Sequence, residues 1–100
     1  MTVTFKTAEL ERCYVQSSEG KRAWGEKVAR LYGRRVDALY AAESAQDLYA
    51  LAALRFHPLK GDRAGQYAIW LTEFMRLIVT FKDRAMTVVQ VEEVSKHYGD

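Results

Sequence analysis

The sequence has a single cysteine, Cys13, and a single proline, Pro58, in 100 residues. One thiol cannot form an intrachain disulfide or a paired metal ligand, which suits a reducing compartment. Glycine-rich phosphate loops, clustered metal ligands and serine–histidine or cysteine–histidine nucleophile patterns are also absent from the sequence. No apolar run approaches the roughly 20 residues of a membrane span, and residues 1–30 lack an apolar signal core. We therefore expect a soluble cytoplasmic protein that has no membrane partner, with Cys13 as a small buried apolar group.

What is present suits one folded domain spanning residues 1–100. Apolar residues make up 49% of the chain and charged residues 28%, which is enough for one core and a solvated surface. The formal net charge is +2, a weak argument by itself for an anionic partner.

The first half of the chain has helical periodicity after a short strand. Thr2 to Lys6 alternates in polarity, and Thr7 can cap a helix that runs to about Gln16. Ser17, Ser18 and Gly20 are expected to break that helix, with either serine capping the next one. The apolar stripe then predicts a long helix over 21–42 and a short helix over 45–52 that starts after Ser44.

The second half alternates as strands do. Four strands are expected, over 55–59, 66–72, 75–81 and 86–94, with a turn-rich loop at 60–65, a hairpin turn at 82–85 and a tail from Ser95. Consecutive strands on tight turns favour an antiparallel meander. The sequence therefore predicts a two-layer α+β fold, with N-terminal helices packed on a mainly antiparallel sheet of four to five strands.

Two polar residues within the strand half stand out. Arg76 lies in an apolar strand, where a charge must be paired or solvated. It could form a buried ion pair with Glu73, Glu92 or Glu93, or its guanidinium fork could bind a phosphate. His57 could be a hydrogen-bonded packing residue or a general acid or base.

The remaining cations have the same two interpretations. The tail Lys96–His97–Tyr98 is either inert and solvated or supplies proton-transfer and phosphate-binding groups. The helical cations, which include Lys27 and Arg34, are either a solvated face or a stripe that follows the phosphates of RNA.

These residues carry a resemblance to a family. The run RFHPLKGDRAGQYAI at 55–69 resembles the HPLKGDxxGxW/Y signature of HigB-like toxins in the RelE/ParE superfamily. MRLIVTF at 75–81 looks like that family's W-R-I-x-F strand, with Met75 where tryptophan is common, and VTFK at 3–6 is also similar. The likeness spans essentially the whole chain. The end departs from the family pattern, because Lys96 replaces an acid, and His97 and Tyr98 stand in reversed order.

The resemblance implies a RelE-like fold and a toxin of a type II toxin–antitoxin system that cleaves mRNA on the ribosome without a metal or cofactor. It implies neutralisation by a cognate antitoxin, a helix-turn-helix protein of the HigA type. His57 and Arg76, with His97 and Tyr98, are then the candidate catalytic residues. The candidate RNA-binding and phosphate-binding cations are Arg55, Lys60, Arg63, Lys96, Lys27 and Arg34.

Two other functions suit the same expected fold. One is a ParE-like toxin that binds DNA gyrase and cuts nothing, and the other is an inactive relic that only binds its antitoxin. Fold alone does not separate them. Cleavage requires His57, Arg76 and the tail to converge on one concave face, whereas gyrase binding does not.

Overall fold

The computed structural model describes residues 1–96, which form a helical layer and a five-stranded sheet. The helices are α1 (Ala8–Val15), α2 (Ser17–Trp24), α3 (Glu26–Ala41) and α4 (Ala45–Tyr49), with 3₁₀ turns η1 (Ala52–Leu54) and η2 (Gly61–Arg63). The strands are β1 (Thr2–Phe5), β2 (His57–Pro58), β3 (Tyr67–Trp70), β4 (Met75–Phe81) and β5 (Val88–Lys96).

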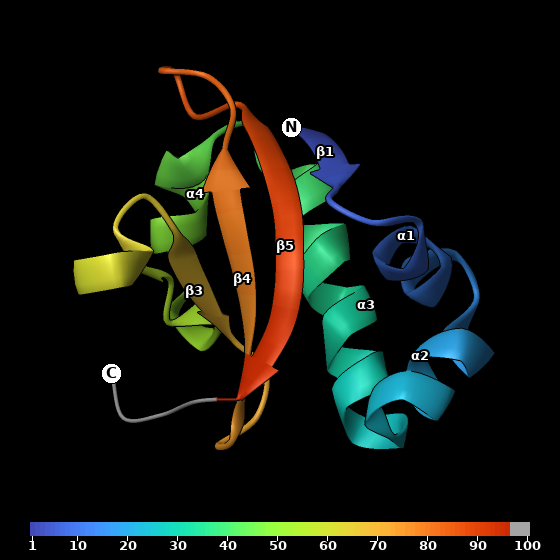
Figure 1. Cartoon of the computed structure of the whole chain (residues 1–100). Coiled ribbons are helices and arrows are strands. Elements are labelled where there is room, and N and C mark those ends of the chain that lie inside the picture. The colour runs from blue at the N-terminus through green and yellow to red at the C-terminus, as the bar shows by residue number, and fades with distance from the viewer. Residues whose placement is uncertain (97–100) are drawn as a thin grey trace.

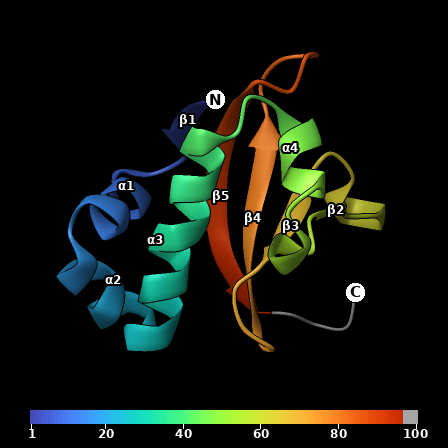
Figure 2. The same ribbon diagram turned by 180° about the vertical axis from the view of Figure 1, so that it is seen from behind.

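The sheet has the order β1-β5-β4-β3-β2. Strands β2 to β5 form the expected antiparallel meander, and β1 pairs in parallel with β5. Figure 1 looks onto the sheet with α3 and α4 behind the strands, and Figure 2 shows these helices in front of them. Among residues 1–96, helices thus cover one face of the sheet and none covers the other, which confirms the predicted two-layer α+β architecture.

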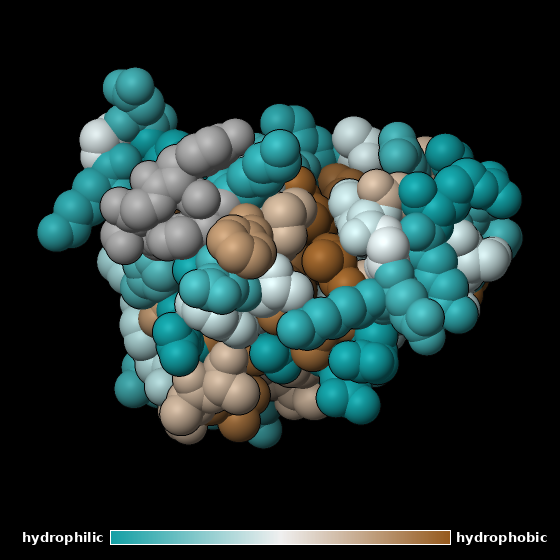
Figure 3. Space-filling view, turned by 90° about the horizontal axis from the view of Figure 1, so that it is seen from below, coloured by the Kyte–Doolittle hydropathy of each residue, from teal (hydrophilic) through white to brown (hydrophobic). Residues whose placement is uncertain are grey.

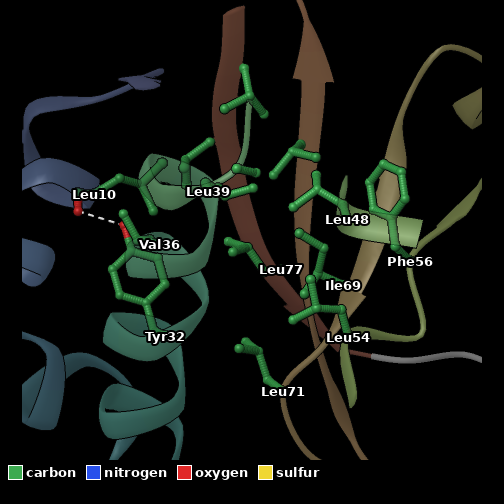
Figure 4. Packing of buried hydrophobic residues seen from close by; sticks show 14 of the residues in the cluster. Leu10, Tyr32, Val36, Leu39, Leu48, Leu54, Phe56, Ile69, Leu71 and Leu77 are labelled. Carbon is green, nitrogen blue, oxygen red and sulfur yellow. Dashed lines mark hydrogen bonds between the residues drawn. The ribbon is translucent and has the colours of Figure 1, made fainter. Parts of the chain in front are cut away.

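The core lies between α3 and the covered face of the sheet (Figure 4). Tyr32, Val36 and Leu39 of α3 are fully buried because the helical period places them on one stripe. The Tyr32 hydroxyl donates to the carbonyl of Leu10 at 2.7 Å, which ties α1 to α3. Burial raises the pKa of Tyr32, so this phenol stays protonated and keeps donating. Cys13 is buried as predicted, and burial raises the pKa of its thiol.

The long helix predicted over 21–42 is wrong in one respect, since the structure divides it at Gly25. This residue has φ +85° and ψ 166°, a backbone conformation that is almost restricted to glycine. The break between the first two helices lies at Gln16, so Ser17 and Ser18 belong to the first turn of α2 instead of capping it. The two other predicted caps are confirmed, because Thr7 Oγ1 accepts from the amide of Leu10 and Ser44 Oγ from that of Gln46.

The last strand begins and ends two residues later than predicted. Asp83 accepts hydrogen bonds from Thr87 and from the amide of Val88, which extends the turn and delays β5. These bonds lower the pKa of the Asp83 carboxyl. Near its middle, β5 carries a bulge, because Ile78 pairs with Glu93 whereas the next residue, Val79, pairs with Val91. Glu92 is the additional residue.

The end of the molecule that holds the β3–β4 turn and the start of α3 has an apolar hollow with hydrophilic residues beside it (Figure 3). Phe74 in that turn is also exposed. Within residues 1–96, no helix has both the length and the apolar character needed to cross a membrane.

The substitutions Gly25→Ala and Gly33→Ala should change the free energy of unfolding in opposite directions. Gly25→Ala should destabilise the fold by about 1–3 kcal/mol because alanine is strained at φ +85°. Gly33→Ala, within α3 and with nothing within 4 Å of the added Cβ, should stabilise it by about 0.5–1 kcal/mol. Urea unfolding of both variants would measure this. Equal effects would mean that Gly25 does not separate the two helices.

Candidate functional site

The candidate site lies on the face of the sheet that carries no helix, here called the open face. Along β4, Leu77 and Val79 point into the core, so alternation places Arg76 and Ile78 on the open face. Strand register then aligns His57, Ala68, Ile78 and Glu93 in one row across four strands. Paired residues share a face, so His57, Arg76 and Glu93 occupy the same side of the sheet.

Trp70 is the centre of a second row. It pairs directly with Arg76 across β3 and β4, and its ring lies 4.2 Å from the Arg76 guanidinium carbon. The guanidinium carbon of Arg55 lies 4.0 Å from the centroid of the same ring. Both cations therefore lie within reach of the negative π face of one indole, a favourable cation–π arrangement.

Arg76 is buried, with 7% of its surface exposed. Its Nη1 donates to the carbonyls of Thr72 at 2.6 Å and Met75 at 3.0 Å, so it binds the inner side of the β3–β4 turn. Two of the three acids considered as its ion-pair partners have other partners. Glu92 pairs with Lys6 and accepts from Thr80, and Glu93 pairs with Arg63 at 3.4 Å.

His57 is half-buried in the short strand β2. Its Nδ1 lies 2.8 Å from the carbonyl oxygen of Arg55. A carbonyl can only accept, so Nδ1 carries the hydrogen and the neutral ring has its lone pair on Nε2. The strand is shorter than the 55–59 predicted, because Arg55 has a left-handed backbone with φ 46° and Pro58 has no amide hydrogen.

An open hollow of about 450 Å³ lies beside His57. Among the described residues, its lining is His57, Pro58, Leu59, Lys60 and Arg63. Arg63 also donates to Gln66 at 3.0 Å, and its ion pair with Glu93 carries its side chain towards β5. The hollow thus combines an imidazole with two cations, a set that suits an anionic ligand.

The other predicted site residues lie elsewhere. Lys96 pairs with Met75, so strand register places it on the face opposite to Arg76. Lys27 and Arg34 are exposed on α3, in the layer behind the sheet. His97 and Tyr98 lie outside the described residues. Within residues 1–96, no group of three or more histidines, cysteines or acids could hold a metal ion.

Sequence reasoning missed three residues of this region. Trp70 was given no role, and Glu93 was considered only as a partner of Arg76. Arg35 lies within α3, and its Nε donates to the carbonyl of Trp70 at 2.9 Å. Burial lowers the pKa of Arg35, with a further contribution from Arg34. If the pairing register of β3 and β4 had been predicted from the sequence, it would have placed Trp70 beside Arg76.

No protein-family model and no curated protein matches the chain. Solved structures do match, and they define the class of the fold as that of RelE-like toxins. One is a YoeB/ParE toxin from Agrobacterium tumefaciens, with a TM-score of 0.65 and 15% identity over 98% of this chain and 100% of that one. Another is the YoeB–YefM complex from Staphylococcus aureus, with a TM-score of 0.54 and 17% identity over 98% of both chains. A third is a histidine-to-glutamine mutant of YafQ from E. coli, with a TM-score of 0.56 and 14% identity over 95% of this chain and 91% of that one.

Removing the two main charges of the open face should have unequal effects on stability. Arg76→Met should cost about 1–3 kcal/mol, because partly buried carbonyls of the β3–β4 turn lose their charged donor. Glu93→Gln should cost less than about 1 kcal/mol, because its ion pair with Arg63 is half-exposed. Chemical unfolding would compare them. If Arg76→Met were as mild as Glu93→Gln, the guanidinium would not hold the turn.

Proposed function

We propose that this chain is a toxin of a type II toxin–antitoxin system, in the HigB-like branch, and that it cleaves mRNA on the ribosome. The RelE-like fold supports the toxin role. The observation that carries the nuclease proposal is the gathering of His57 with Lys60, Arg63 and the two arginines on Trp70 at one face of the sheet.

The proposed reaction uses the RNA itself as the nucleophile. The ribose 2′-hydroxyl attacks the adjacent phosphorus, the bond to the 5′-oxygen breaks, and the products carry a 2′,3′-cyclic phosphate and a 5′-hydroxyl. One group must remove the proton of the 2′-hydroxyl, another must protonate the leaving oxygen, and cations must stabilise the charge on phosphate. Each general acid or base contributes roughly 10²–10⁴-fold in rate.

We assign proton transfer to His57, since its ring orientation is fixed through Nδ1. Lys60 and Arg63 line the hollow beside it and would bind the phosphate. Arg76 would add positive charge from its buried position on the open face, where the carbonyls of the β3–β4 turn hold its guanidinium. His97 and Tyr98 remain candidates for the second proton transfer and for base stacking, through the family likeness.

The remaining cations have a different place in this proposal. Lys27 and Arg34 lie in the helical layer, away from the open face, so they would contribute to ribosome affinity through RNA phosphates and not to cleavage. Lys96, at the end of β5 on the other face, would contribute in the same way.

A ParE-like toxin that binds DNA gyrase is the second candidate. The observation in its favour is Arg76, which is nearly buried and binds backbone carbonyls, as a structural arginine would. A relic that only binds its antitoxin would share this feature. Both alternatives leave the fold unchanged, so only activity separates them.

The nuclease proposal predicts new RNA ends after induction. Expression of the chain should stop growth and produce 5′-hydroxyl ends in ribosome-bound mRNA. His57→Ala should reduce cleavage by about 10²–10⁴-fold, as expected for loss of one general acid or base. Sequencing of 5′-hydroxyl RNA ends would measure both. Arg84→Ala is the matched control, because Arg84 is an exposed cation in the β4–β5 turn.

The outcomes separate the three candidate functions. Growth arrest with intact mRNA and damaged DNA would favour gyrase binding and exclude cleavage. Normal growth with a folded chain would favour the relic. Full cleavage by a folded His57→Ala variant would leave the nuclease function intact and exclude the proposed site.

A cognate antitoxin should neutralise the chain. The match to the YoeB–YefM complex supports a partner protein, and the HigB-like signature supports a helix-turn-helix antitoxin. Co-expression of a small helix-turn-helix protein encoded next to this gene should restore growth and co-purify with the chain in a stoichiometric complex. If no neighbouring product restores growth or binds, the antitoxin assignment is wrong.

A further inference from the structure

Arg55 was expected to bind RNA, and the structure places it between Trp70 and His57. It follows the 3₁₀ turn η1 and has a left-handed backbone with φ 46° and ψ 41°. This conformation is disfavoured for a residue with a Cβ relative to the right-handed region. Strain of this kind persists only where the surroundings impose it.

Two contacts oppose that strain. The Arg55 guanidinium carbon lies 4.0 Å from the centroid of the Trp70 ring, and a cation over an indole is a favourable contact. The next residue, Phe56, is buried and stacks on Tyr67 with ring centroids 5.2 Å apart. The chain at Arg55 is thus held by an indole on the open face and by an aromatic core contact on the other.

The consequence reaches His57. The carbonyl of Arg55 accepts from Nδ1 of His57 at 2.8 Å, so the backbone of Arg55 determines both the orientation and the tautomer of the ring. In an unconstrained neutral histidine, either nitrogen can carry the hydrogen. Here the carbonyl of Arg55 can only accept, so the hydrogen of the neutral ring is on Nδ1.

We propose that Arg55 is a positioning residue, which stacks on Trp70 and thereby fixes His57 as its Nδ1–H tautomer with Nε2 as the proton-transferring atom. Its use in catalysis rests on the proposed nuclease function, whereas the tautomer can be tested without RNA. Trp70 is part of the same device, since it also contacts Arg76 and so connects both arginines to β3.

The stacking of Arg55 on Trp70 depends on the planar shape of the guanidinium, whereas phosphate binding by Arg55 would depend mainly on its charge. A lysine keeps the charge of Arg55 but cannot reproduce the flat guanidinium that stacks on an indole. An asparagine tolerates the left-handed backbone but removes the cation. Arg55→Lys and Arg55→Asn therefore separate positioning from phosphate binding. Arg55 is exposed, so neither change opens the core.

The first test is the ¹⁵N NMR spectrum of the His57 ring in the full chain at pH 8, where an ordinary histidine is neutral. The wild-type chain should show the Nδ1–H tautomer. Arg55→Lys, Arg55→Asn and Trp70→Leu should each shift the ring towards the Nε2–H form, and Arg84→Lys should not. A wild-type ring with its hydrogen on Nε2 overturns the proposal. So does a ring that keeps the Nδ1–H tautomer in folded Trp70→Leu, because Phe56 alone would then hold the chain.

The second test is cleavage of ribosome-bound mRNA. All three variants should lose about 10- to 100-fold in kcat with little change in KM, since a misplaced proton-transfer group slows chemistry without weakening binding. Arg55→Asn combined with Trp70→Leu should be no worse than Trp70→Leu alone, because the contact between Arg55 and Trp70 is already lost in that variant. Full activity in Arg55→Lys, with loss only in Arg55→Asn, would assign Arg55 to phosphate and overturn the proposal.

The two tests fail in different ways. The wild-type chain could cleave no RNA while the His57 tautomer still changes in the Arg55 and Trp70 variants. That result would reject the nuclease function and support the positioning of the His57 ring by Arg55.

Discussion

The packing of α3 on one face of the sheet is the constraint on which the rest of the structure depends. Tyr32, Val36 and Leu39 bury the apolar side of β4 and β5, and α1 is joined to this layer through the Tyr32 hydroxyl. Side chains along a strand alternate between the two faces of the sheet. When every second residue points into the core, the residues between them point to the open face. Most polar residues of the strands therefore lie on the open face, among them His57 and Arg76.

Much of this fold could be predicted because its signals are local. Thr7 and Ser44 cap helices as expected, and four strands follow one another on short connections. The division at Gly25 could not be predicted from periodicity, since the apolar stripe continues through Trp24 into α3. Only the left-handed backbone of that glycine separates the two helices, and glycine within a helix is ambiguous, as Gly33 shows.

The sequence pointed to the polar residues of the candidate site but not to their arrangement. Strand register places His57 and Arg76 on one face, and Arg76 donates to turn carbonyls because the β3–β4 turn folds back onto it. The contact of Arg55 with Trp70 joins residues that are 15 positions apart in the sequence. It depends on strand register and on a left-handed residue, neither of which a pattern of residue types specifies.

The bulge at Glu92 has a consequence for the charge of the open face. In a two-residue period, one additional residue exchanges odd and even positions for the rest of the strand. With it, Val94 returns to the core, Glu93 aligns with His57, and Lys96 falls on the helical side. Without it, Val94 and Lys96 would occupy the open face and Glu93 would enter the core. The one additional residue thus determines which residues at the end of β5 lie on the open face. With the bulge, the acid Glu93 lies on the same face as His57, and without it the base Lys96 would.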